Sequence, residues 1–377
     1  MTIPFTVLIT LGRLPPSIDL ARSFSAAGWR VLIAEPFRWH LARTSRSVDR
    51  AYATPAPAQD PEGYRRAILD IVEQEAVTLI VPVSEETMHV VALASQLPDH
   101  CRLFSSDAAT TRRLHSKLGF IETALEAGLD VPKTARSGTP LAAELIAAGD
   151  VFEKPEYSCS GRSVKRLQRA ADAPLVTGML IQQAISGEEV SAFAITRGGR
   201  IIAHVCYRAV VRHGSVAIVF ERIERPAVTA WLAGLVTHTQ YSGFISIDAI
   251  IESDDRVIAI ECNPRATSGL HFFDKENLAD AIAGNLEQLM PAPTRVLQEF
   301  WSALTHYLTV FWRPDQRRKT GQAIRDATDI TWDKRDPGVF LLAFLSTWPI
   351  ISKAIARRAT FAEVSTLDLE WTGHDEA

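Results

Sequence analysis

The chain has 377 residues, of which 47% are hydrophobic and 22% are charged, and its formal net charge is -4. This length suits two or three domains, and the composition is that of a globular protein with a sizeable core, not of a disordered chain. The small net charge argues against a protein whose main partner is nucleic acid. The four cysteines are far apart and form no CxxC pair, which predicts reduced thiols in a cytoplasmic protein and argues against a zinc site.

The first part of the chain, residues 1–104, alternates strand and helix patterns. Strands are expected at residues 5–10, 29–34 and 78–83, and helices at residues 17–27 and 62–75. Gly28 is placed to end the first helix in a left-handed conformation. This alternation predicts a small parallel α/β domain. A Gly-x-Gly-x-x-Gly turn is absent after the first strand, so dinucleotide binding is not predicted there.

Residues 105–293 show a denser strand pattern. Ser105-Ser106-Asp107 is a helix N-terminus, and the helix is expected to run to about Lys117. A second helix should end at Gly128. Strands are expected at residues 151–155, 180–184, 189–196, 200–207, 243–252 and 256–263. Their density predicts an antiparallel α+β domain.

The remaining residues, 294–377, differ in character. Apolar or amphipathic helices are expected at residues 297–311 and 339–358, with a basic run at 313–319 between them. The segment also contains five tryptophans: Trp301, Trp312, Trp332, Trp348 and Trp371. Such residues serve weak docking on a membrane surface, packing against the rest of the protein, or a homodimer contact. No apolar stretch reaches the roughly 20 residues needed to span a bilayer.

A predicted β-hairpin carries the most informative polar residues. If Asp254 and Asp255 form its two-residue tip, Asp248 lies directly opposite Glu261, with Cβ atoms about 5 Å apart. Alternation puts Asn263 on the same face. The other face is then an apolar layer of Ile247, Ala249 and Ile251 against Cys262, Ile260 and Ile258.

Two carboxylates that face each other repel, so this pairing is unfavourable unless a cation lies between them. Magnesium takes oxygen ligands and needs only one or two carboxylates when phosphate oxygens complete its shell. Asp248, Glu261 and Asn263 are therefore candidate metal ligands. A solvated face whose acids only add solubility is the alternative, and a register slip of one residue would separate the pair.

Two lysines precede this hairpin in a fixed order. Lys117 comes before the connection at residues 128–132, and Lys154 lies in Phe152-Glu153-Lys154-Pro155. Together with Asp248 and the later Glu261-Cys262-Asn263-Pro264-Arg265, they resemble the motifs of the ATP-grasp superfamily. That family includes D-alanine–D-alanine ligase, biotin carboxylase and the large subunit of carbamoyl phosphate synthetase. The resemblance covers about residues 1–290.

The resemblance implies an organisation in three parts. An α/β N-terminal (pre-ATP-grasp) domain at 1–104 would precede an α+β ATP-grasp domain at 105–293, with lobes at about 105–180 and 181–293. A C-terminal helical extension would occupy 294–377. The implied cofactors are ATP and Mg²⁺.

The resemblance also implies roles for individual residues. ATP contacts would come from Lys117 and Lys154, from the loop containing Gly161, from the adenine hinge Gln182, Gln183 and Ile185, and from Glu189 at the ribose. Lysine ammoniums neutralise triphosphate charge, and magnesium bridges phosphate oxygens during phosphoryl transfer. Lys154 and Arg265 are the expected catalytic residues, because the planar fork of Arg265 suits an anionic phosphorylated intermediate.

Three features depart from the family pattern or leave a role open. The loop between Lys154 and Val164 has only one glycine, Gly161, and its Cys159 lacks a partner histidine at readable spacing. Glutamines stand in the hinge where acidic residues are common. Arg208 and Arg212 lie near the expected acceptor site, where they would bind a substrate carboxylate or simply be exposed on a surface strand.

The expected activity is therefore that of an ATP-dependent carboxylate–amine ligase. It would activate a small-molecule carboxylate as an acyl phosphate, transfer the acyl group to an amine, and release ADP and phosphate. The alternatives are carboxylation or phosphotransfer by the same fold, or a nucleotide-binding regulatory protein without catalysis.

Overall fold

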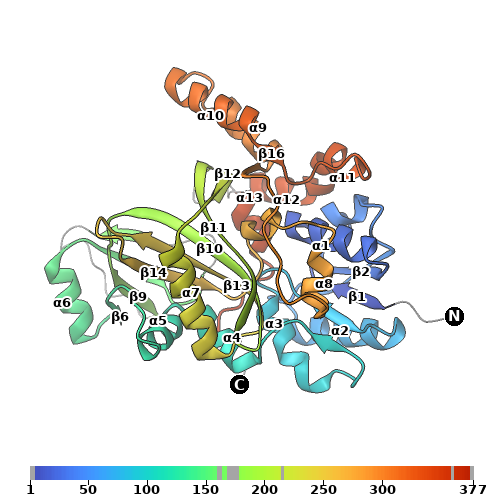
Figure 1. The fold of residues 1–377 in the computed structure, drawn as a ribbon, viewed down its shortest axis with the longest axis horizontal. Coiled ribbons are helices and arrows are strands. Elements are labelled where there is room, and N and C mark those ends of the chain that lie inside the picture. The colour runs from blue at the N-terminus through green and yellow to red at the C-terminus, as the bar shows by residue number, and fades with distance from the viewer. Residues whose placement is uncertain (1–4, 159–163, 168–177, 214–215, 358–360, 374–377) are drawn as a thin grey trace.

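The structure is a computed structural model, and it describes residues 5–158, 164–167, 178–213, 216–357 and 361–373. Three β-sheets organise the chain (Figure 1). The predicted α/β domain is confirmed: a five-stranded, fully parallel sheet has the order β3-β2-β1-β4-β5. Its strands are β1 Thr6–Ile9, β2 Arg30–Glu35, β3 Arg50–Ala53, β4 Leu79–Val81 and β5 Arg102–Leu103, and its helices are α1 Pro15–Ala26, α2 Pro61–Gln74 and α3 Thr87–Val90. Gly28, with a φ of 80°, follows α1 in the left-handed conformation expected of it.

The next part of the chain forms a small antiparallel sheet. Its order is β6-β9-β7-β8, with β6 Thr134–Arg136, β7 Val151–Pro155, β8 Lys165–Leu167 and β9 Met179–Gln183. Three helices accompany it: α4 Ala108–His115, α5 Lys117–Glu126 and α6 Pro140–Ala148. The expected extent of the first helix is wrong. The chain leaves α4 at His115, and Ser116 begins α5 by accepting a hydrogen bond from the backbone N–H of Gly119.

The largest sheet has seven strands in the order β14-β13-β10-β11-β12-β15-β16. These are β10 Glu188–Arg197, β11 Arg200–His213, β12 Val216–Ile223, β13 Gly243–Ile251, β14 Val257–Asn263, β15 Val296–Gln298 and β16 Thr328–Asp329. The helix α7, Pro226–Thr239, packs with α5 on one face of this sheet, over Val190, Ala192 and Ile247. Part of the opposite face, including Phe193, packs against the N-terminal domain.

The C-terminal extension is helical, as expected, but it also enters the large sheet through β15 and β16. Its helices are α9 Phe300–Thr309, α10 Pro314–Asp326, α11 Gly338–Leu341, α12 Ala343–Arg357 and α13 Phe361–Thr366. Figure 1 shows α9 and α10 projecting from the body, while α11 and α12 lie beside the N-terminal domain. No helix in the described part of the chain is long and apolar enough to cross a membrane.

Ion pairs fasten this extension to the N-terminal domain. Arg22 of α1 contacts Asp336 at 3.1 Å, and Arg13 contacts Asp368 at 2.6 Å, with little solvent access to any of the four side chains. Asp336 also accepts a hydrogen bond from the Ser45 hydroxyl. Buried charges are costly unless they are paired, so these contacts fix where the extension lies.

Candidate active site

The hairpin β13–β14 places the two predicted carboxylates opposite each other. Asp248 pairs with Glu261 and Ser246 with Asn263, so the expected register is confirmed at the polar face. The expected two-residue tip is wrong: strand pairing ends at Ile251 and Val257. A register shift between Asp248 and Ala249 compensates for the longer loop. The apolar face therefore consists of the pairs Ile247–Cys262, Ala249–Ala259 and Ile251–Val257, without Ile260 or Ile258 in the places expected for them.

Asp248 is the centre of a hydrogen-bonded group. The Ser191 hydroxyl donates to its Oδ1 at 2.6 Å, and Nδ2 of Asn263 donates to its Oδ2 at 3.2 Å. Burial and, next, the negative charge of Glu261 raise the pKa of Asp248 to about 6. A bound cation would relieve both effects.

Lys154 reaches this group from the small sheet. It lies on β7, is 5% exposed, and donates to Oε1 of Gln182 at 2.7 Å and to the backbone carbonyl of Ile260 at 3.2 Å. Its ammonium group thus lies between the small sheet and the hairpin β13–β14, which carries the candidate metal ligands and is called the metal hairpin from here on. Burial lowers the pKa of Lys154 to about 8; the nearby Lys117 also lowers it, whereas Glu261 and Asp248 raise it.

Lys117 reaches the same place from the first position of α5. Its Nζ donates to the carbonyl and the hydroxyl of Ser158 at 3.1 and 3.0 Å and lies 3.8 Å from Oε1 of Glu261. Its backbone N–H donates to the carbonyl of Glu156. Because Lys117 begins a helix, the attraction of cations to helix C-termini cannot account for its position.

Arg265 joins the hairpin to the N-terminal domain. Its Nε donates to Glu85 at 2.7 Å, and one of its terminal nitrogens donates to Oδ1 of Asn263 at 3.0 Å. Glu85 is buried after β4 and also lies 3.4 Å from Nε2 of His115. Ser191, Glu85 and His115 were not predicted. The sequence did contain a signal for Glu85, because this residue follows the expected strand at residues 78–83. Ligands of parallel α/β sheets bind at the carboxyl ends of the strands.

The donor set fits a magnesium ion held jointly with phosphates. Within the described residues, no cluster of three His, Cys, Asp or Glu side chains could hold a metal alone. Asp248 and Glu261 supply the one or two carboxylates that magnesium needs beside phosphate oxygens. Oδ1 of Asn263 is engaged by Arg265, so its use as a third ligand requires that this hydrogen bond be exchanged.

The predicted nucleotide-binding residues lie in different settings. Gln182 is buried and supports Lys154, whereas Gln183 is exposed and Ile185 is half-buried on the following segment. Glu189 shares the carboxylate face, because its charge contributes to the raised pKa of Asp248. Gly161 and Cys159 fall outside the described residues.

The two predicted substrate arginines lie on opposite faces of the large sheet. Arg212 contacts Glu189 at 2.5 Å, on the carboxylate face. Arg208 instead contacts Glu188 and Glu221 at 3.0 and 3.1 Å, on the face covered by α7. Register shifts in β11 between the two arginines explain the difference. Arg208 therefore lies on the other face from Asp248, and its role in binding a substrate carboxylate stays a prediction.

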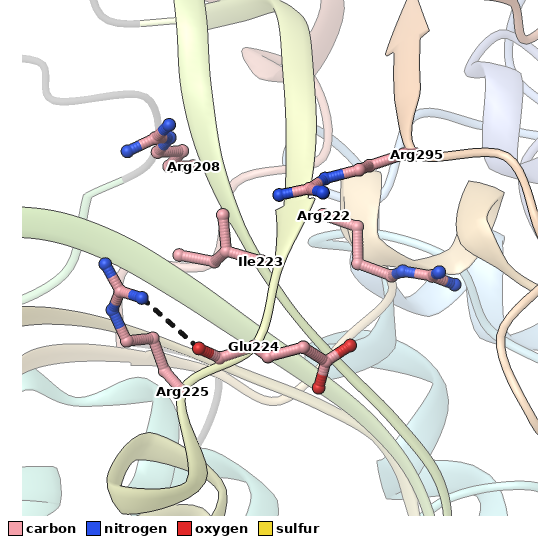
Figure 2. Close-up of a pocket in the computed structure, with 6 residues that line it drawn as sticks. All are labelled: Arg208, Arg222, Ile223, Glu224, Arg225 and Arg295. Carbon is pink, nitrogen blue, oxygen red and sulfur yellow. Dashed lines mark hydrogen bonds between the residues drawn. The ribbon is translucent and has the colours of Figure 1, made fainter.

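Two surface cavities lie away from the lysines and the metal hairpin. One of about 330 Å³ is lined by Arg208, Arg222, Ile223, Glu224, Arg225 and Arg295 (Figure 2). The other, of about 1080 Å³, extends along the start of α7 and the tip of the hairpin. Neither includes Lys117 or Lys154 in its lining, because both ammonium groups bond to the protein's own acceptors and occupy the space between the sheets.

Two lysines that face paired carboxylates between two sheets have the charges and oxygen ligands that suit a nucleotide polyphosphate with its metal ion. The chain contains an ATP-grasp domain: residues 114–269 match the family model described by that name. This match confirms the resemblance and the fold class expected from the sequence. No curated protein matches the chain.

Solved structures support the same fold. N5-carboxyaminoimidazole synthetase from Staphylococcus aureus, complexed with ADP, has a TM-score of 0.63 at 13% identity, covering 79% of this chain and 83% of its own. The biotin carboxylase domain of 2-oxoglutarate carboxylase from Hydrogenobacter thermophilus, with MgADP and bicarbonate, has a TM-score of 0.61 at 14% identity. The match covers 75% of this chain and 70% of that chain. L-amino acid ligase from Bacillus licheniformis has a TM-score of 0.60 at 14% identity, and the match covers 78% of this chain and 79% of that chain.

Proposed function

We propose that the protein is an ATP-dependent ligase that phosphorylates a small-molecule carboxylate and transfers the acyl group to an amine. The observation that carries this proposal is the convergence of Lys117 and Lys154 on the facing pair Asp248 and Glu261. Neighbours with this fold include an L-amino acid ligase and proteins crystallised with ADP. The products would be the amide, ADP and phosphate.

Each side chain of the site has a distinct task in this reaction. Lys154 would exchange its contact with Gln182 for phosphate oxygens, and Lys117 would contact phosphate with the donor that Ser158 does not engage. Asp248 and Glu261, with Asn263, would hold magnesium, which supplies charge neutralisation during phosphoryl transfer. Arg265, held by Glu85, would stabilise the anionic acyl phosphate with its positive charge. Arg212 is the one predicted substrate arginine on this face.

The decisive experiment uses a carboxylate labelled with oxygen-18. The protein is incubated with ATP, magnesium and pools of labelled acids, with and without pools of amines. An acyl phosphate intermediate moves one labelled oxygen into the released phosphate, which mass spectrometry detects. AMP and pyrophosphate as products would mean an adenylating enzyme and overturn the proposal. No nucleotide turnover with any pool, despite ATP binding, would favour the regulatory alternative.

A second candidate is carboxylation, because several neighbours of this fold are carboxylases. Bicarbonate is itself a carboxylate that ATP can phosphorylate. An additional arm of the same assay therefore supplies bicarbonate without organic acids. ADP release that requires bicarbonate would favour this candidate, and label in an amide product would favour ligation.

The C-terminal extension carries the surface that best fits a partner. Between residues 300 and 357 there are nine Lys and Arg against five Asp, whereas the whole chain has a net charge of -4. The large apolar side chains exposed there are Leu308, Phe311, Trp312, Trp332, Leu341, Leu342, Phe344, Leu345 and Trp348. Exposed tryptophans among cationic residues suit an anionic phospholipid surface, so we propose peripheral docking of a cytoplasmic protein there.

Vesicle sedimentation tests this docking. The protein should sediment with phosphatidylcholine vesicles that contain phosphatidylglycerol and remain free with phosphatidylcholine alone. Trp312→Ala should weaken the binding, and high salt should weaken it further. Concentration-dependent dimerisation without lipid, lost in the same variant, would instead assign this surface to a homodimer contact.

A further inference from the structure

The described end of the chain returns from the extension to the active site. After α13 the chain is held by Asp368, whose carboxylate contacts the buried Arg13 and whose carbonyl accepts from the N–H of Ala58 at 3.1 Å. Arg13 also donates to the carbonyl of Ser365 at 3.3 Å. From this anchor the segment runs toward α4 (Figure 1). A terminal segment fixed by a buried ion pair is not a loose tail.

Trp371 in this segment packs against His115 at the end of α4 and Tyr157 just after β7. The indole is 6% exposed, and its ring centroid lies 5.2 Å from that of Tyr157 and 6.1 Å from that of His115. The guanidinium of Arg112 lies 4.9 Å from the indole centroid. Most of the other tryptophans of the extension are more exposed: Trp312 is 87% exposed. The surroundings of Trp371 are those of a core residue, although it is near the end of the chain.

Tyr157 lies between the two residues that hold Lys117. The carbonyl of Glu156 accepts from the N–H of Lys117, and the carbonyl and hydroxyl of Ser158 accept from its Nζ. The Ser116 hydroxyl also donates to the Glu156 carboxylate at 2.7 Å. Trp371 therefore supports, through a single ring contact, the backbone segment that positions the lysine ammonium.

We propose that Trp371 is a positioning residue for the ATP site and that residues 367–373 form a C-terminal brace. The brace holds residues 156–158 and thereby sets where Lys117 meets the phosphates. It also covers this side of the site against water, which would otherwise hydrolyse an acyl phosphate. The inference deepens the proposed function and rests on it for the second effect only, since ATP binding does not require turnover.

Three variants test the brace: Trp371→Ala removes the ring contacts, Trp371→Phe keeps an aromatic ring, and Trp39→Ala is the control. Trp39 is exposed on the N-terminal domain, where the guanidinium of Arg43 lies over its ring. Trp371→Ala should weaken ATP binding by roughly two- to tenfold, the range expected for losing aromatic contacts. It should also raise ADP release relative to product. Trp371→Phe should recover most of the affinity, and Trp39→Ala should match the wild type.

Intrinsic fluorescence supplies a readout that an indirect loss of folding does not reproduce. Adding ATP and magnesium should change the tryptophan emission of the wild type and of Trp39→Ala, and this change should be absent in Trp371→Phe. Unchanged ATP affinity in a folded Trp371→Ala protein would overturn the brace and leave the proposed function untouched. Failure of the wild type to bind ATP would overturn the proposed function instead.

Discussion

Lys154 combines a buried position with a role that requires positive charge. Burial lowers its pKa to about 8, so the free protein loses this charge as the pH rises through that value. The negative charge of a bound triphosphate favours the charged form of Lys154 and raises the pKa of Lys154 in the complex. ATP affinity should therefore fall as pH rises from about 7 to 9, with up to one proton taken up on binding. Calorimetry in buffers of different ionisation enthalpy measures both quantities.

Lys154→Arg is the matched control for this pH dependence, because a guanidinium stays charged throughout the range. The variant is expected to bind ATP more weakly, since a larger planar guanidinium does not fit the place of the ammonium group between Gln182 and Ile260. Its affinity should nevertheless be flat between pH 7 and 9. An equally steep decline in the variant would show that another group is responsible.

Glu261 tests the metal assignment at the opposite side of the site. Glu261→Gln removes the charge that faces Asp248 and preserves the shape of the side chain. We expect turnover to fall by about a hundredfold or more, because the magnesium ion loses one of its two carboxylates. The fold should be little affected, because the relief of repulsion from Asp248 is offset by the lost attraction to Lys117 and Lys154. Wild-type turnover at saturating magnesium would show that Glu261 is not a ligand.

At the residue scale, the sequence predicted a contact correctly where a rule of local structure determines which two residues face each other. Strand alternation and a hairpin were enough to place Asp248 opposite Glu261. Ser191 and Glu85 were missed because their contacts join segments that are distant in the chain. The face on which Arg208 lies could not be predicted, because irregularities within β11 change which face a side chain occupies, and the sequence does not mark them.

At the element scale, the start of α5 links helix stability to the site. Ser116 accepts from Gly119 as an N-cap and donates to Glu156, which contacts Lys117. Ser116→Ala should destabilise the protein by about 1 kcal/mol, as loss of a cap does. It should also weaken ATP binding, because the segment after Glu156 is released. Denaturant unfolding and ATP titration measure the two effects.

Asp107→Ala provides the comparison for this variant. Asp107 caps α4 by accepting a hydrogen bond from the backbone N–H of Thr110 at 2.9 Å. Asp107→Ala should lower the free energy of unfolding by an amount similar to that of Ser116→Ala and leave ATP affinity unchanged. If both variants weakened ATP binding equally, the effect of Ser116 would be a general consequence of lower stability.

The metal hairpin shows how far an element can be predicted. Its strands and the pairing of Asp248 with Glu261 were correct, but the loop was longer than expected and the strands nearer the tip are shifted. The shift between Asp248 and Ala249 restores the register at the carboxylates. Bulges depend on how the whole sheet twists and packs, and hydrophobic alternation alone does not locate them.

At the scale of the whole molecule, the three predicted parts share one core. A single cluster contains Val7 and Phe24 of the N-terminal domain, Phe193 of the large sheet, and Val339 and Leu369 of the extension. The boundaries at residues 104 and 293 remain predictions about the course of the chain. The extension could not be placed from the sequence, because β15 and β16 are very short and their partners lie far away in the chain.

This shared core predicts that the protein unfolds as one cooperative unit. A chain ending at Pro293 would lose β15, part of the core and the partners of Arg13 and Arg22, leaving two buried cations with fewer counter-charges. We expect it to be too unstable to purify as a folded protein.

In the full chain, Asp336→Ala alone should lower the free energy of unfolding by about 3–5 kcal/mol, the range for breaking a buried ion pair. Substitution of the exposed Asp315 by alanine should lower it little. Calorimetry should show a single transition for the full chain, shifted by Asp336→Ala. Two separate transitions, with only one of them moved by that substitution, would mean that the extension and the N-terminal domain fold independently of the ATP-grasp domain.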